Sequence, residues 1–178
     1  PTPGALTRPF AGMYSLWFGN PTTGNFLSDG GSCGAGSGGS GSPVQGAMTS
    51  PEYEIPGNAA DLRVGFWYWF EIEGVDPNIY YDRMTILVST NGTDYVEVGV
   101  LNPAVDTNGG PSQAYTSAGF LQVPSWNKAD IALPDEIVNA AKASGSLWIR
   151  FNFNSGDGSY NAFRGWMIDN LSLRGNGC

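Results

Sequence analysis

The stretch DLRVGFWYWFEIE, residues 61–73, is the strongest structural signal in the chain. Apolar and polar side chains alternate along it with a period of two, as in a β-strand with one face in a core. One face carries the apolar set Leu62, Val64, Phe66, Tyr68, Phe70 and Ile72. The other face carries Arg63, Gly65, Trp67, Trp69, Glu71 and Glu73. The pattern therefore predicts a long strand whose first face lies in the core.

Shorter stretches on either side predict further strands. Residues 84–89 alternate in the same way, and residues 95–98 resume the pattern after Asn91 and Gly92. Because Asn-Gly accepts the positive φ of a tight turn, this segment predicts an antiparallel hairpin. Two more strands are predicted at residues 147–153 and 165–173. A strand-like segment also includes residues 53–55.

The connections between these strands are long, and only one of them predicts a helix. Residues 134–143 carry acidic residues in the first turn and are followed by Gly145, which is typical of a short helix. Residues 101–126 predict an irregular connection with at most one short strand, near residues 120–123. Residues 30–42 predict a flexible Gly/Ser loop. We expect a single all-β domain over residues 1–178, a two-sheet antiparallel β-sandwich of jelly-roll type.

Composition excludes several classes of protein. The 178 residues include no histidine and carry a net charge of −8. Serine–histidine and cysteine–histidine catalysis and histidine-ligated metals are therefore excluded, and the acidic balance argues against nucleic acid and anionic membranes. No apolar run approaches the roughly 20 residues that span a bilayer, so we expect no membrane insertion. The N-terminus lacks the features of a signal peptide, which indicates a processed or cut chain.

The two cysteines, Cys33 and Cys178, are too few for a four-thiolate metal site. Cys33 lies in the Gly/Ser segment and Cys178 is the last residue. A disulfide that ties down the C-terminus is compatible with an oxidising compartment, and two free thiols are the alternative.

The order of several short motifs resembles the jelly-roll modules related to MAM domains, which accompany secreted bacterial peptidases, glycoside hydrolases and adhesins. The resemblance spans nearly the whole chain. It implies a carbohydrate-binding-module-like β-sandwich in a larger secreted protein. The chain lacks the four cysteines of eukaryotic MAM domains, which argues against their type of cell adhesion. The motifs are Leu16 to Asn20, Thr23 to Phe26, Thr49 to Pro51, Leu62 to Glu73, Tyr81-Asp82, Val88 to Gly92, Ile149 to Phe151 and Gly165 to Asn170.

The resemblance also implies a structural calcium ion, held by an acid of the final strand and by oxygens from earlier segments. Asp169 matches that acid. Calcium takes six to eight oxygen ligands, so carboxylates and carbonyls from distant strands suit it. The candidate partners are Asn20, Asn25 and Asp29, and a second candidate pair is Glu73 and Asp82. Alternatively, Glu73 and Asp82 are surface acids or hydrogen-bond acceptors that hold the loop at residues 74–81.

Tryptophans on the second face of the 61–73 strand are candidate ligand contacts. Trp67 and Trp69 lie two residues apart, and Trp148 is a candidate to join them from a neighbouring strand. Such a platform stacks on sugar rings. Its hydrogen-bonding groups would be Arg63, Glu71, Arg150 and Asn152. Alternatively, residues 101–126 cover this face and the tryptophans are structural.

Any hydrolytic chemistry would depend on carboxylates, and Glu71 with Glu73 is the candidate pair. Residues two apart on one strand face have Cα atoms roughly 6.5–7 Å apart, within the range that glycosidases use. We expect a non-catalytic, secreted or cell-surface module that binds a polysaccharide or glycoprotein surface. The alternatives are a structural or assembly domain of a secreted protein, and a glycosidase.

Overall fold

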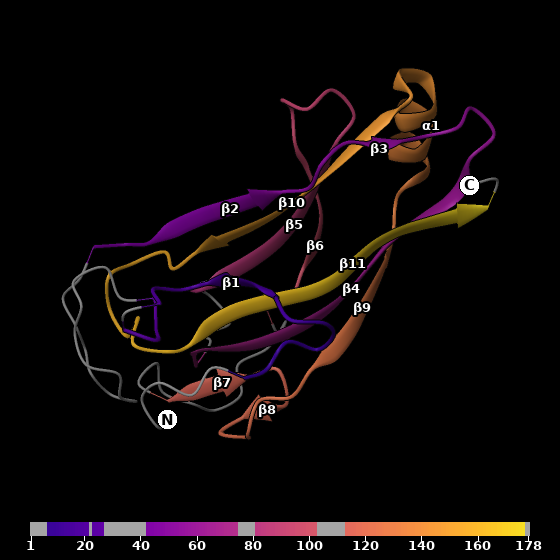
Figure 1. Ribbon diagram of the computed structural model, residues 1–178. Helices are drawn as coiled ribbons and strands as arrows, with labels where there is room; N and C mark the ends of the chain where they lie inside the picture. The colour runs from indigo at the N-terminus through magenta and orange to yellow at the C-terminus, as the bar shows by residue number, and fades with distance from the viewer. Residues whose placement is uncertain (1–6, 22, 27–41, 75–80, 103–112, 177–178) are drawn as a thin grey trace.

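The computed structural model describes residues 7–21, 23–26, 42–74, 81–102 and 113–176. Two antiparallel sheets lie face to face (Figure 1). In the first, named the β4 sheet here, the strand order is β1-β11-β4-β7-β8, and β9 also pairs with β4. Its strands are β1 (Leu16–Phe18), β4 (Ala60–Glu73), β7 (Ala114–Thr116), β8 (Gly119–Phe120), β9 (Asn127–Ala132) and β11 (Gly165–Asn176).

The second sheet, named the β10 sheet, has the order β2-β10-β5-β6, and β3 also pairs with β10. Its strands are β2 (Gln45–Thr49), β3 (Tyr53–Glu54), β5 (Arg83–Ser89), β6 (Val96–Val100) and β10 (Ser146–Asn154). The prediction of an all-β sandwich of two antiparallel sheets is confirmed. No helix in the described ranges is long and apolar enough to cross a membrane.

The core lies between β4 and β10, where the predicted stripe meets the second sheet. Leu62, Val64 and Ile72 have no solvent exposure. The ring of Phe66 meets that of Phe151 edge to face, with centroids 5.0 Å apart. The alternating apolar residues of β10, from Leu147 to Phe153, are buried in the same way. Period-two patterning thus located the core correctly, because successive side chains of a strand point to opposite faces.

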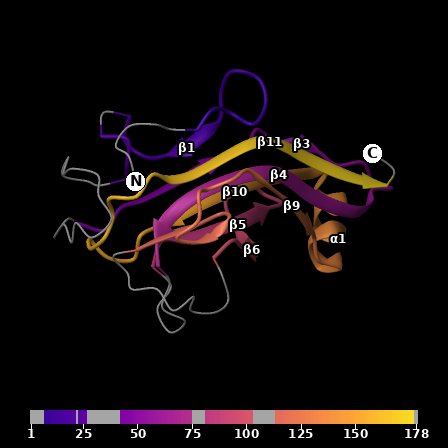
Figure 2. The ribbon, with the colours of Figure 1, turned by 90° about the horizontal axis from the view of Figure 1, so that it is seen from below.

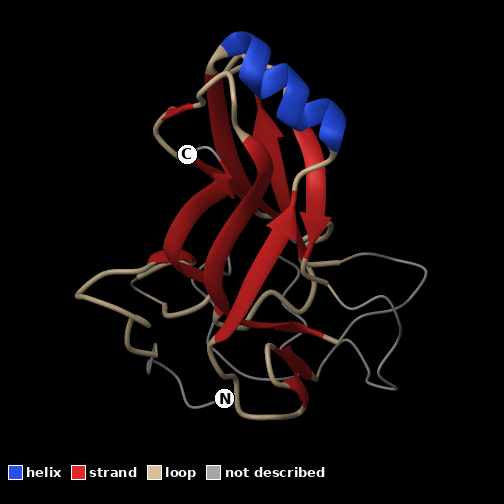
Figure 3. Ribbon diagram, turned by 90° about the vertical axis from the view of Figure 1, so that its right-hand side faces the viewer, coloured by secondary structure: helices blue, strands red, loops and turns tan. Residues whose placement is uncertain are grey.

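The helix α1 (Asp135–Ser144) closes one end of the sandwich (Figure 3). It buries Val138 and Ala141, and it ends at Gly145, whose φ of 76° is the left-handed conformation that favours glycine. The predicted hairpin is also present, since β5 and β6 pair around Gly92, which has a φ of 77°.

Four strands differ from the sequence prediction. β1, β2 and β9 were not predicted, and β7 is a second short strand beside β8 in residues 101–126, where at most one was expected. β9 is half exposed along its length, so its apolar and charged residues do not form a strong stripe. β1 is a three-residue strand at the edge beside β11 (Figure 2). The predictions for residues 30–42, Asp29, Cys33 and Cys178 lie outside the described residues.

Candidate functional site

A cluster of buried polar side chains lies at the end of the sandwich opposite α1 (Figure 1). Glu73 is the last residue of β4, Asp82 directly precedes β5, and Asn161 lies between β10 and β11. The exposed fractions of these three residues are 1%, 0% and 1%. The sandwich brings them together from segments that are far apart in sequence, because β4 and β10 both end here. We name these three residues the end cluster.

Hydrogen bonds orient the Asp82 and Asn161 side chains of the end cluster. The Glu73 backbone N–H donates to Asp82 Oδ2 at 2.9 Å. Asn161 Nδ2 donates to Ser155 Oγ at 3.3 Å and to the Asp157 carbonyl at 3.0 Å. Because the Asn161 amide is held through its nitrogen, its oxygen points the other way. The segment is anchored in turn by the Asp82 N–H, which donates to the Ser155 carbonyl at 3.2 Å.

Three oxygen atoms of the end cluster are buried without a hydrogen-bond partner. They are Glu73 Oε1, Asp82 Oδ1 and Asn161 Oδ1. Buried polar atoms are almost always paired, because an unpaired one loses its bonds to water without replacement. Among the described residues, these three oxygens are therefore candidate ligands for a group outside the polypeptide.

Burial, and then repulsion by neighbouring acids, raises the pKa of both carboxyl groups. The pKa of Glu73 rises to about 9 through loss of solvation, then through the charges of Asp82 and Asp157. Burial and Asp157 also raise the pKa of Asp82, although the bond from the Glu73 N–H opposes this rise. Without a cation, Glu73 is therefore protonated at neutral pH, and burial shifts Asp82 in the same direction. A cation would reverse that preference, because it stabilises the ionised carboxylates.

The donor chemistry of the end cluster fits a hard divalent cation. All three unpaired atoms are oxygens, which calcium prefers over nitrogen or sulfur. Within the described ranges, no three carboxylate or thiolate side chains converge closely enough to hold a metal by themselves. The amide oxygen of Asn161 is the third buried oxygen that lacks a partner, beside those of Glu73 and Asp82. Sequence reasoning missed Asn161, which lies in a Gly/Ser/Asn-rich loop without periodicity.

Asp169, the predicted calcium ligand of the final strand, does not join this cluster. Asp169 pairs across the sheet with Trp67, six positions along β4 from Glu73. At about 3.3 Å per residue the two acids are roughly 20 Å apart, too far for one ion. Asn20 forms an isolated bridge with Asn25 in the turn after β1. Glu73 and Asp82 are therefore a candidate site separate from Asp169, and the set of Asp169, Asn20, Asn25 and Asp29 stays a prediction.

The predicted tryptophan platform does not exist as one surface. Trp67 and Trp69 lie on the outer face of β4, whereas Trp148 lies on β10 in the other sheet. The ring of Phe10 stacks on Trp67 at a centroid distance of 3.7 Å. Trp69 is only 2% exposed, and the Arg164 guanidinium lies 4.8 Å from its ring. Phe10 of the N-terminal segment and Arg164 make these contacts. They do not come from residues 101–126, which the alternative interpretation expected to cover this face.

Trp148 and Arg150 share the outer face of the β10 sheet with Tyr95. The Arg150 guanidinium lies 3.6 Å from the centroid of the Tyr95 ring, and its Nε donates to Thr49 Oγ1 at 2.9 Å. Trp148 is half-buried and stands two residues along the same strand face. Sequence reasoning missed Tyr95, because its position beside Arg150 depends on how β6 and β10 pair with β5. We name Trp148, Arg150 and Tyr95 the β10 face.

The proposed catalytic pair, Glu71 and Glu73, is not arranged for attack on a substrate. Glu71 is 3% exposed and is ion-paired with Arg164, whose Nε lies 2.6 Å from Glu71 Oε2. A second bond joins Arg164 Nη2 to Glu71 Oε1 at 3.2 Å. Glu73 is directed into the end cluster. Glu71 is therefore held by its ion pair with Arg164, and Glu73 belongs to the end cluster. Neither carboxylate lines a described cavity.

Known proteins are similar to this chain in structure and not in sequence. No family model matches the chain, and no curated protein sequence matches it. Among solved structures, the chain is similar to the K1 cleaved adhesin domain of Lys-gingipain from Porphyromonas gingivalis W83, with 17% sequence identity and a TM-score of 0.42. The similarity covers 82% of this chain and 73% of that chain. The assignment of the fold rests on the strand pairing described above, and the resemblance to MAM domains stays a prediction.

Proposed function

We propose that this chain is a calcium-stabilised, non-catalytic binding module of a secreted or cell-surface protein. The observation that carries the proposal is the end cluster, in which Glu73, Asp82 and Asn161 each bury an oxygen without a partner. A divalent cation would bond to all three and neutralise the two carboxylates. Calcium at extracellular concentration suits such a site, since extracellular modules bind it with Kd values of about 10⁻⁴–10⁻³ M.

The role of the ion would be structural. Glu73 belongs to the β4 sheet, Asp82 precedes β5 of the β10 sheet, and Asn161 lies in the connection from β10 to β11. Because the ligands come from separate segments, the site exists only in the folded chain, and binding energy adds to the stability of the fold. At a calcium concentration 100 times Kd, this contribution is about 2.7 kcal/mol.

Isothermal titration with calcium tests the metal site. We expect one equivalent to bind to the wild-type chain, and binding to be lost in Glu73→Gln and Asp82→Asn. Asp130→Asn is the matched control, because Asp130 is an acid in an exposed ion pair at the surface. Equal calcium binding by wild type and Glu73→Gln would refute the site.

The β10 face is the surface that we propose for glycan recognition. Arg150 is held between Tyr95 and Thr49, so its remaining nitrogens are oriented before a ligand arrives. Trp148 supplies a ring for stacking on a pyranose, and the guanidinium donates to hydroxyl groups. Both residues belong to the predicted ligand set, whereas Trp67, Trp69 and Glu71 are already engaged within the chain.

A glycan array probed in calcium tests this face. We expect Trp148→Ala to abolish binding, and Trp126→Ala to preserve it, since Trp126 precedes β9 of the other sheet. Binding that survives Trp148→Ala would move recognition away from the β10 face. Absence of any glycan ligand would favour a structural or assembly role, which sedimentation of the chain would then reveal as self-association.

A further inference from the structure

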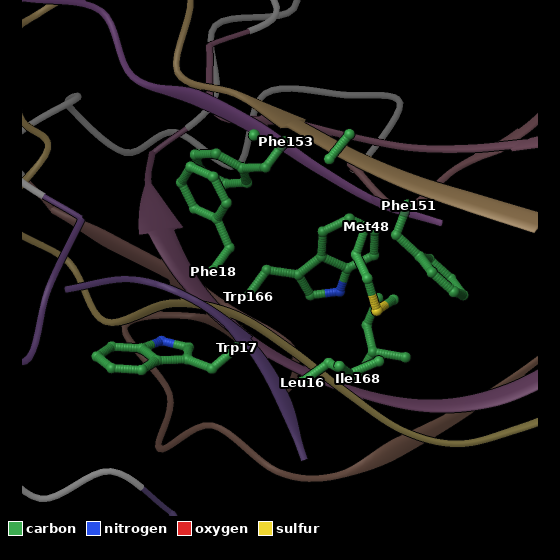
Figure 4. A pocket seen from close by; sticks show the side chains of 10 residues that line it. Leu16, Trp17, Phe18, Met48, Phe151, Phe153, Trp166 and Ile168 are labelled. Atoms are coloured by element: carbon green, nitrogen blue, oxygen red, sulfur yellow. The ribbon is translucent and has the colours of Figure 1, made fainter. Parts of the chain in front are cut away.

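The outer face of β10 carries a cation that no acid among the described residues neutralises. Phe151 and Phe153 of this strand point between the two sheets, where they line an apolar cavity of about 260 Å³ (Figure 4). Because successive side chains of a strand point to opposite faces, Arg150 lies on the outer face. Arg150 belongs to none of the ion pairs formed among the described residues. Its charge is therefore available to an anion from outside the chain.

Two neighbours hold the Arg150 guanidinium in one orientation. The guanidinium lies 3.6 Å from the centroid of the Tyr95 ring, and its Nε donates to Thr49 Oγ1 at 2.9 Å. Within the described ranges, no acceptor bonds to its terminal nitrogens, Nη1 and Nη2. These nitrogens present a planar fork that matches the two oxygens of a carboxylate. The fork is oriented before a ligand binds, which lowers the entropic cost of binding.

Two acids of the β5–β6 hairpin, Glu97 and Asp94, already have partners. Leu87 of β5 pairs with Arg150 on one side and with Glu97 on the other. Arg83 Nη2 donates to both carboxylate oxygens of Glu97, at 2.9 and 3.0 Å. Asp94 accepts a hydrogen bond of 2.7 Å from a side-chain amide of the turn. Repulsion from more distant acids of the chain, whose net charge is −8, is screened beyond about 8 Å at physiological ionic strength.

Trp148 and Asn152 flank Arg150 on the same strand face. Trp148 is half-buried, and the turn at Gly92 lies against its ring, since a Cβ at this glycine would lie 3.6 Å from the ring. The Asn152 backbone carbonyl accepts from a threonine of β5, and its side-chain amide has no partner among the described residues. Side chains two apart on a strand face are roughly 6.5–7 Å apart. A sugar ring stacked on Trp148 would therefore place a substituent beside the Arg150 fork.

We infer that the β10 face selects a glycan that contains a carboxylated pyranose. The pyranose ring would stack on Trp148, and its carboxylate would accept two hydrogen bonds from the Arg150 fork. This inference rests on the proposed function, because it names the class of sugar that the same surface would bind. Hydroxyl groups alone leave the guanidinium charge unpaired. A carboxylate pairs with it through charge-assisted hydrogen bonds, which are about twice as strong as neutral ones.

A glycan array in millimolar calcium, with neutral, sulfated, sialylated and uronate-containing members, is the first test. We expect the glycans that bind to carry a carboxylated pyranose, and the array then shows whether it is a uronic acid or a sialic acid. Binding confined to neutral or sulfated glycans and abolished by Trp148→Ala would overturn this inference and leave the proposed glycan surface intact. Absence of any glycan binding would overturn both.

The decisive comparison uses the tightest-binding carboxylated oligosaccharide of the array and its methyl ester, which removes the charge and keeps the ring. Titration of the wild-type tryptophan fluorescence should give a Kd about tenfold lower for the acid. Arg150→Met should remove this preference. Arg150→Lys should retain only part of it, because lysine keeps the charge but not the planar fork. Equal affinity of the wild type for the acid and the ester would overturn the inference without any variant.

Matched variants separate the Arg150 contact from general charge. Arg174→Met removes an exposed arginine from β11 of the other sheet, and Asp130 keeps Arg63 as its partner. This variant should prefer the acid as the wild type does. Tyr95→Phe keeps the ring against the guanidinium and should keep the preference, whereas Tyr95→Ala should reduce it. Loss of the preference in Arg174→Met would overturn the inference, because net charge rather than the Arg150 fork would then set it.

Discussion

The stability of the calcium-free chain should fall as pH rises through the neutral range, contrary to the behaviour of most carboxylates. The pKa of Glu73 is raised from 4.5 in the unfolded reference to about 9 in the folded chain. Between these values the folded state holds a proton that the unfolded state has released. The free energy of unfolding therefore decreases with pH, at up to about 1.36 kcal/mol per unit for one group.

From about pH 5.5 to 7.5, the loss from Glu73 alone reaches roughly 3 kcal/mol. For a domain of this size, the melting temperature shifts by roughly 2–4 °C per kcal/mol, which gives a decrease of roughly 6–12 °C. Asp82, whose pKa is also raised, adds to the decrease in the same direction. Bound calcium should remove the slope, because the ion replaces the protons on the carboxylates.

The measurement is the melting temperature by circular dichroism at several pH values, in EDTA and again in millimolar calcium. Glu73→Gln is the decisive variant, since it stays neutral at every pH. In EDTA at about pH 7.5 it should melt higher than wild type, and it should gain little from calcium. A wild-type melting temperature that is constant or rises with pH in EDTA would refute the reasoning, as would an equal slope in Glu73→Gln.

Three further predictions concern other parts of the structure. Phe10→Ala removes the ring that covers Trp67, so tryptophan fluorescence emission should shift to the red. The free energy of unfolding should fall by about 0.5–1.5 kcal/mol. Unchanged emission would contradict the stacking. Arg164→Met leaves the buried Glu71 carboxylate without its cation and should cost about 3–5 kcal/mol in urea unfolding, much of it recovered when Glu71→Gln is added. Gly145→Ala meets no neighbouring atom but requires a φ of 76°, so a loss of about 1 kcal/mol is expected, and equal stability would show that the helix end adjusts.

The sequence predicted the elements whose evidence is local. Alternation along β4 and β10 identified the core faces, because the side-chain period of a strand is fixed by its backbone. The turn at Gly92 and the end of α1 at Gly145 were predicted because both need a positive φ. Glu73 and Asp82 were named as a pair through the family resemblance, and the structure does place them in contact.

Only the tertiary structure decided which of these side chains are available to a ligand. The second face of β4 was correctly identified by its period. Phe10 and Arg164 are distant from it in sequence, yet Phe10 stacks on Trp67, and Arg164 contacts Trp69 and pairs with Glu71. Asn161, from a loop without any periodic signal, is connected to Asp82 through hydrogen bonds to Ser155. Strand period fixes the face on which a residue lies, and that information is local. What covers the face is set by long-range packing, which no window of sequence contains.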